Sequence, residues 1–202
     1  MIEKKIIFVT NNATKSRKSY KAKFDELGIS VHVVSPAATS REIPRSIIIL
    51  VQDEIYGSAY TAAVYLSSVL RLPKSQKAYV VGAHGLEEEL AEEGISFIGG
   101  TDPKDNTLAS FSLADFVPDP DVGAVVCGLD KKVNYTKLSK ALQYLLKGCA
   151  FVATNEDSTY PIAHGLLPGA GAVIAPLKTA SGREPVCTGK PSTIMLDCIK
   201  TK

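Results

Sequence analysis

The sequence predicts a mostly parallel α/β fold. Short β-rich runs alternate along the chain with amphipathic or small-residue helices, a pattern typical of strands joined by crossover helices. Three strands run into polar loops, namely VTNN (9–12), ATNED (153–157) and TGK (188–190). In such sheets the ligand lies beyond the carboxyl ends of the strands, so we expect a binding site where these loops meet.

The composition narrows the protein class. The chain has 202 residues, of which 45% are hydrophobic and 22% charged, which suits one globular domain or two small ones with a shared core. A net charge of +2 argues against nucleic-acid binding driven by bulk electrostatics. The apolar runs are too short to span a bilayer, and MIEKKIIFVTNN lacks the features of a signal peptide. We therefore expect a soluble cytoplasmic protein without nucleic-acid or membrane partners.

The elements follow one another in a regular order. The first unit joins the strand KKIIFVTNN (4–12) to the helix KSRKSYKAKFDELG (15–28), which carries an apolar stripe of Tyr20, Phe24 and Leu27. The later elements are a small-residue helix at 57–71 ended by Pro73, a strand and turn at 77–85, an acidic helix at 86–94 interpreted as a solvated face, a strand at 121–130, a leucine-striped helix at 134–148, a strand and loop at 149–161, and a last such unit at 185–200. PGAGAV (168–173) lacks the full GxGxxG spacing and is interpreted as a cap turn that needs flexible glycine.

The start of the first helix is unusually basic. Lys15, Arg17 and Lys18 lie where the helix dipole is already positive and acidic residues are expected. The cluster predicts either an anion site or a solvated basic face, and this stretch alone leaves both open.

Cysteine and histidine give no metal or disulfide pattern. We expect buried small hydrophobes at Cys127, Cys149, Cys187 and Cys198, and surface or loop residues at His32, His84 and His164.

Two strand ends carry groups suited to one phosphate. Thr10 offers a hydroxyl and Asn11 a backbone N–H, while Lys190 follows Gly189 and precedes Pro191, a residue suited to the first turn of a helix. Thr and Lys on neighbouring strand tips would form a phosphate-binding pair, although Lys190 taken alone would be interpreted as a surface lysine.

Five stretches together resemble a known family. FVTNNATKSRKSYKAKF, GLDKKVNYTKLSKALQYL, FVATNEDSTYP, LLPGAGAVIAPLKTASGREP and TGKPS are similar, in order and spacing, to the p-nitrophenylphosphatase and phosphoglycolate phosphatase branch of the haloacid dehalogenase superfamily. The resemblance implies a Rossmann-like core with an inserted α/β cap of the C2 type. It also implies magnesium-dependent hydrolysis of phosphate monoesters through an aspartyl-phosphate. By motif position, Thr10 and Lys190 would be catalytic and phosphate-binding residues, with Asn11 beside Thr10.

The resemblance also divides the chain and shows departures from the family. Residues 1–75 would be a partial core, 76–185 the cap, and 186–202 the return to the core. The family's DxD motif, with its nucleophile, and its closing GDxxxTD motif have no counterpart, so the chain is expected to be truncated at both ends and to lack the Mg²⁺ ligands. An atypical insert near 31–52 suggests an imperfect gene model or a degenerate paralogue.

Asn155 and Asp157 fall where this branch places a cap loop that faces the active site. They are expected either to contact substrate or to act as ordinary turn formers.

The family resemblance predicts a phosphatase that acts on small phosphorylated metabolites such as p-nitrophenyl phosphate or phosphoglycolate. The alternative is a noncatalytic phosphate-binding or cap-mediated interaction protein, compatible with a cap-mediated homodimer. A dinucleotide oxidoreductase is a more distant third hypothesis.

Overall fold

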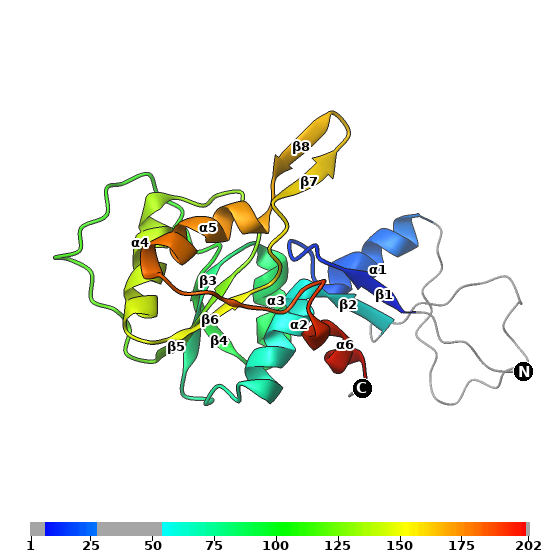
Figure 1. Cartoon of the computed structure of the whole chain (residues 1–202), viewed down its shortest axis with the longest axis horizontal. Helices are drawn as coiled ribbons and strands as arrows, with labels where there is room; N and C mark the ends of the chain where they lie inside the picture. The colour runs from blue at the N-terminus through cyan, green and yellow to red at the C-terminus, as the bar shows by residue number, and fades with distance from the viewer. Residues whose placement is uncertain (1–6, 28–53, 201–202) are drawn as a thin grey trace, which may run out of the picture.

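The computed structural model describes residues 7–27 and 54–200 (Figure 1). The predicted insert near 31–52, His32 and the first residues of the predicted strand at 4–12 lie outside these ranges. The elements are β1 (Phe8–Thr10), α1 (Arg17–Glu26), β2 (Ile55–Gly57), α2 (Ser58–Val64), the π-helical turn η2 (Tyr65–Val69), β3 (Lys77–Val81), α3 (His84–Glu92), β4 (Ser96–Gly99), β5 (Val122–Cys127), α4 (Tyr135–Leu146), β6 (Ala150–Ala153), β7 (Thr159–Ile162), β8 (Gly165–Pro168), α5 (Ala170–Ser181), β9 (Val186–Cys187) and α6 (Thr193–Lys200).

A five-stranded parallel sheet organises the molecule, with the strand order β4-β3-β5-β6-β9. The parallel α/β architecture predicted from the alternating pattern is thus confirmed. After β3 the next strand, β4, is added on one side of the sheet, whereas after β5 the next strands, β6 and β9, are added on the other side. The direction in which strands are added therefore reverses between β3 and β5. At such a switch point the loops after the strands diverge and leave room for a ligand.

Each face of this sheet is covered by helices (Figure 1). Successive side chains of a strand point to opposite faces, so Tyr79 and Val81 pack with α4 and α5 while Val80 packs with α2 and α3. The small residues of α2, Ala59, Ala62 and Ala63, allow that helix to lie close to the sheet.

A second, two-stranded parallel sheet pairs β1 with β2. Phe8, Tyr20, Phe24 and Ile55 form its small core against α1, which explains two of the three residues in the predicted apolar stripe. Leu27 ends the helix and is 63% exposed. The division at 75/76 and 185/186 stays a prediction. In the described structure β9 extends the five-stranded sheet and α2 covers one of its faces.

Two interpretations were wrong. The acidic helix is not a solvated face, because Glu87 and Glu89 of α3 are only 5% and 1% exposed. Each carboxylate has polar partners inside the fold: Glu87 accepts from the backbone and hydroxyl of Thr101, and Glu89 pairs with Arg17. PGAGAV is not a turn: Pro168 ends β8, Gly169 is the N-cap of α5, and residues 170–173 begin that helix. A Cβ on Gly171 would lie 2.5 Å from the carbonyl oxygen of Glu156, so glycine serves close packing here.

The hairpin of β7 and β8 was not predicted. It projects from the molecule (Figure 1), and its residues are exposed except for the half-buried Tyr160. Neither strand packs against the core, so the hairpin lacks the alternation of apolar and polar residues by which strands are recognised. Pro161 and Pro168 also argue against strands at these positions.

Cys127 and Cys198 are buried as predicted, whereas Cys149 and Cys187 are half-buried. His84 and His164 lie at the surface, also as predicted. Within the described residues, each helix is too short or too polar to cross a bilayer.

Candidate functional site

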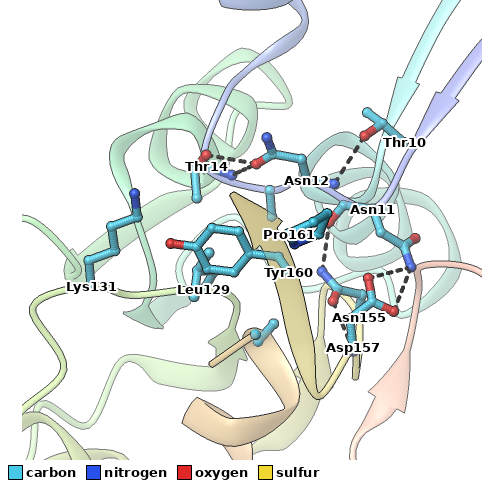
Figure 2. A pocket seen from close by; sticks show the side chains of 13 residues that line it. Thr10, Asn11, Asn12, Thr14, Leu129, Lys131, Asn155, Asp157, Tyr160 and Pro161 are labelled. Carbon is cyan, nitrogen blue, oxygen red and sulfur yellow. Dashed lines mark hydrogen bonds between the residues drawn. The ribbon is translucent and has the colours of Figure 1, made fainter. Parts of the chain in front are cut away.

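The strand-end residues singled out in the sequence meet in the structure. Thr10 ends β1 and Asn11 follows it, Asn155 and Asp157 follow β6, and Lys190 follows β9. Figure 2 shows the first four of these around one cavity. The rule that ligands lie beyond the carboxyl ends of parallel strands therefore located these segments correctly.

Asn11 links the segments. Its Oδ1 accepts from the backbone N–H of Lys190 at 2.8 Å, and its Nδ2 donates to the carbonyl oxygen of Lys190 at 3.0 Å. The same Nδ2 lies 3.2 and 3.3 Å from the two carboxylate oxygens of Asp157. The backbone oxygen of Asn11 accepts from Asn155 Nδ2 and Ser58 Oγ, both at 2.7 Å. Because its amide is fully engaged, Asn11 fixes the geometry of the site.

Thr10 and Lys190 lie on the two sides of this link. Thr10 Oγ1 accepts from the backbone N–H of Asn12 at 3.2 Å and lies 3.5 Å from the hydroxyl of Tyr20. Burial raises the pKa of Tyr20, so this neighbour is a neutral hydroxyl. The ammonium of the exposed Lys190 reaches back to the carbonyl oxygen of Val9 at 3.5 Å. The Thr10 hydroxyl and the Lys190 ammonium therefore both lie beside β1, but they line two cavities that share Asp157: Thr10 lines the first and Lys190 the second.

Gly189 makes the approach of Lys190 possible. A Cβ at this position would lie 2.3 Å from the carbonyl oxygen of Thr154 and 2.8 Å from Asn11 Oδ1. Any larger residue would therefore push β9 away from the β1 and β6 loops.

Asn155 and Asp157 have different environments. Asn155 is 4% exposed, and its Oδ1 accepts from the backbone N–H of Asp157 at 3.1 Å, so it forms the turn and braces Asn11. Asp157 is exposed and lines the cavity. Asn155 thus acts as a turn former, one of the two expected roles. A substrate contact by Asp157 stays a prediction.

The cavity has a volume of about 410 Å³ and polar and apolar walls (Figure 2). It is lined by Thr10, Asn11, Asn12, Ala13, Thr14, Leu129, Lys131, Asn155, Asp157, Tyr160, Pro161, Gly169 and Ala170. Sequence reasoning missed Lys131, although it follows β5 just as Asn155 follows β6, so the strand-end rule could have found it. Tyr160 could not be found in this way, because it lies on the hairpin.

The three basic residues at the start of α1, Lys15, Arg17 and Lys18, have different environments. Arg17 is 6% exposed and is not part of an anion site: its guanidinium lies 2.9 Å from both Glu89 and Glu92 and 3.6 Å from the centre of the Tyr60 ring. Lys15 and Lys18 are exposed, as the solvated-face reading predicts.

The described residues do not form a magnesium site. Within 7–27 and 54–200 there is no group of three His, Cys, Asp or Glu side chains placed to hold a metal ion. Among the residues that the structure describes, Asp157 is the single carboxylate lining the cavity, and it is bonded to Asn11. We therefore derive no reaction step through a metal.

Comparisons with known proteins agree with the motifs. Residues 2–96 match the family model described as haloacid dehalogenase-like hydrolase. The chain is 43% identical over 198 residues to 4-nitrophenylphosphatase of Schizosaccharomyces pombe, covering 97% of this chain and 60% of that protein. It is 37% identical over 205 residues to phosphoglycolate phosphatase 2 of Arabidopsis thaliana, covering 98% and 61%.

A solved structure shows the same fold. Glycerol phosphate phosphatase from Mycobacterium tuberculosis, determined in complex with magnesium, superposes with a TM-score of 0.72 at 26% identity, covering 100% of this chain and 50% of that one. The chain thus spans 60–61% of the length of the two curated relatives. Motifs, fold and comparisons agree that the chain is related to the p-nitrophenylphosphatase and phosphoglycolate phosphatase branch of the haloacid dehalogenase-like hydrolases.

Proposed function

We propose that the chain forms the phosphoryl-binding and leaving-group-facing parts of a site that hydrolyses small phosphate monoesters. The observation that carries this proposal is the pair of hydrogen bonds between the Asn11 amide and the backbone of Lys190. These bonds hold the Thr10 strand tip and the Lys190 loop together. In the proposed site the hydroxyl and the ammonium contact one phosphoryl group from the two cavities that they line, which share Asp157.

In this proposal each residue has a distinct role. Thr10 and Lys190 stabilise the negative charge of the transferring phosphoryl group. Asn11 and Asn155 position them, and Asp157 faces the leaving group. The core–cap organisation, with residues 76–185 as a C2-type cap, is part of the same proposal.

The remaining chemistry would come from groups that the described residues do not supply. The family resemblance implies an aspartate nucleophile and Mg²⁺, and one solved relative is a complex with magnesium. A cytoplasmic location, a small phosphorylated metabolite as ligand and a cap-mediated homodimer stay predictions.

A noncatalytic phosphate-binding protein is the second candidate. It is favoured by one observation: Asp157, the single carboxylate that the described part of the chain places on the cavity wall, is already bonded to Asn11 and is poorly placed to act as a nucleophile.

Hydrolysis of p-nitrophenyl phosphate with Mg²⁺ separates the two candidates. Turnover by the purified chain that falls roughly 100-fold in Lys190→Ala would establish a phosphatase whose nucleophile lies within these 202 residues, because the variant loses one transition-state contact. Lys147→Ala is the matched control, since Lys147 is an exposed residue at the end of α4. Saturable binding of inorganic phosphate without turnover would instead establish the binding function for this chain.

A further inference from the structure

The cavity has a charged end that the phosphoryl-binding residues do not explain. Lys131 lies on the loop after β5, and in Figure 2 the Tyr160 ring lies between Lys131 and the group formed by Asn11, Asn155 and Asp157. The ammonium of Lys131 is 5.7 Å from the centre of that ring. The cavity therefore has a polar end near Thr10 and a cationic end at Lys131.

The charge of Lys131 is not neutralised by its neighbours. The adjacent Asp130 is buried and already accepts from Lys137 Nζ at 2.6 Å and from the backbone N–H of Lys132 at 2.7 Å. Lys131 itself forms no ion pair with any residue in 7–27 or 54–200. Asp157 lies elsewhere on the cavity wall, where its carboxylate accepts from Asn11.

The wall between the two ends is mainly apolar. Leu129, Tyr160 and Pro161 line it and exclude part of the water that would otherwise screen a charge. A free ammonium beside such a wall attracts an anionic group more strongly than it would on an open surface. A neutral leaving group would contact the same wall without using Lys131.

We propose that Lys131 determines specificity: it selects phosphate monoesters whose leaving group carries an anionic group of its own, a carboxylate or a second phosphate. This inference rests on the proposed function, because the phosphoryl group must be held at the Thr10 end of the cavity for the other end of the ligand to face Lys131. Since Lys131 is exposed, we expect the selectivity to weaken as the salt concentration rises.

Calorimetric titration with three probes tests the proposal without requiring turnover. Phosphoglycolate carries a carboxylate, ethyl phosphate is a comparable monoester without one, and inorganic phosphate reports the phosphoryl end alone. The 202-residue chain is compared with Lys131→Met, Lys131→Glu and the control Lys132→Met. Lys132 is also exposed but lines only a neighbouring cavity of about 240 Å³.

We expect the chain to bind phosphoglycolate about tenfold more tightly than ethyl phosphate, because one charge-assisted contact distinguishes them. The ratio should fall to about one in Lys131→Met and below one in Lys131→Glu, and should persist in Lys132→Met. Equal affinities in the unmodified chain, or a preference that survives Lys131→Met, would overturn the inference.

The titration with inorganic phosphate distinguishes an error in the role of Lys131 from an error in the proposed phosphoryl-binding function. Phosphate binding without a preference for phosphoglycolate rejects the role of Lys131 and leaves the phosphoryl site in place. If the folded chain binds none of the three probes, both proposals are wrong.

Discussion

At the scale of single residues, Asn11 has the largest structural role in the site. One side chain joins the β1 tip to the Lys190 loop and to Asp157, three segments that are distant in sequence. In the sequence Asn11 is simply the neighbour of Thr10, and its backbone N–H was the group expected to bind phosphate. The side-chain role was missed because its partners lie 146 and 179 positions away.

Replacing the Asn11 side chain should therefore weaken phosphate binding even if that side chain makes no contact with the phosphate. In Asn11→Ala we expect about tenfold weaker phosphate binding and a loss of about 0.5–1.5 kcal/mol in the free energy of unfolding, since the exposed Lys190 backbone and Asp157 lose their side-chain hydrogen bonds. Calorimetry and urea unfolding measure the two effects. Unchanged phosphate affinity would show that the Asn11–Lys190 link does not organise the site.

At the scale of elements, α1 and α3 are joined by a buried ion pair. The Arg17 guanidinium lies 2.9 Å from Glu89 Oε2, and the two side chains are 7% and 1% exposed. The predicted solvated helix was wrong here because an acidic pattern such as LEEELAEE gives no sign of a buried cation 72 positions away.

Removing one partner of this pair should be costly. Arg17→Met should lower the free energy of unfolding by about 3 kcal/mol, because Glu89 is left without its cation. The double variant Arg17→Met/Glu89→Gln should recover part of that loss. Urea unfolding of the two single variants and the double variant gives the coupling energy, and strictly additive losses would mean that the pair contributes nothing specific.

The same pair predicts a pH dependence. Burial raises the pKa of Glu89, with Arg17 acting in the opposite direction. A raised pKa in the folded state means that the native protein keeps this proton to higher pH than the unfolded chain. The stability contributed by Glu89 is then greatest below about pH 4.5, its ordinary pKa, and is lost as the pH rises through the folded-state value.

The measurement compares the unmodified chain with Glu89→Gln in urea between about pH 4 and 8. The free energy of unfolding of the unmodified chain, minus that of the variant, should decrease as the pH rises. An increase with pH would mean that Arg17 outweighs burial and that the pKa is lowered.

At the scale of the whole molecule, the strands of the large sheet could be predicted from the sequence, whereas the start of α5 and the β7–β8 hairpin could not. The strands at 77–81, 122–127 and 150–153 were recognised because buried parallel strands are continuous apolar runs. The loops of Thr10, Asn155 and Lys190 followed from the rule for strand ends. The start of α5 and the hairpin were not predicted, because packing of Gly171 against Glu156 and the position of Tyr160 depend on tertiary contacts.

The most direct test of the account is the affinity of the chain for inorganic phosphate, measured by calorimetry beside Lys190→Met and the control Lys147→Met. If Thr10 and Lys190 form one phosphoryl site, the chain and the control should bind phosphate equally, and Lys190→Met should bind at least about tenfold more weakly. Equal affinity in all three proteins, or no binding by the folded chain, would contradict the account.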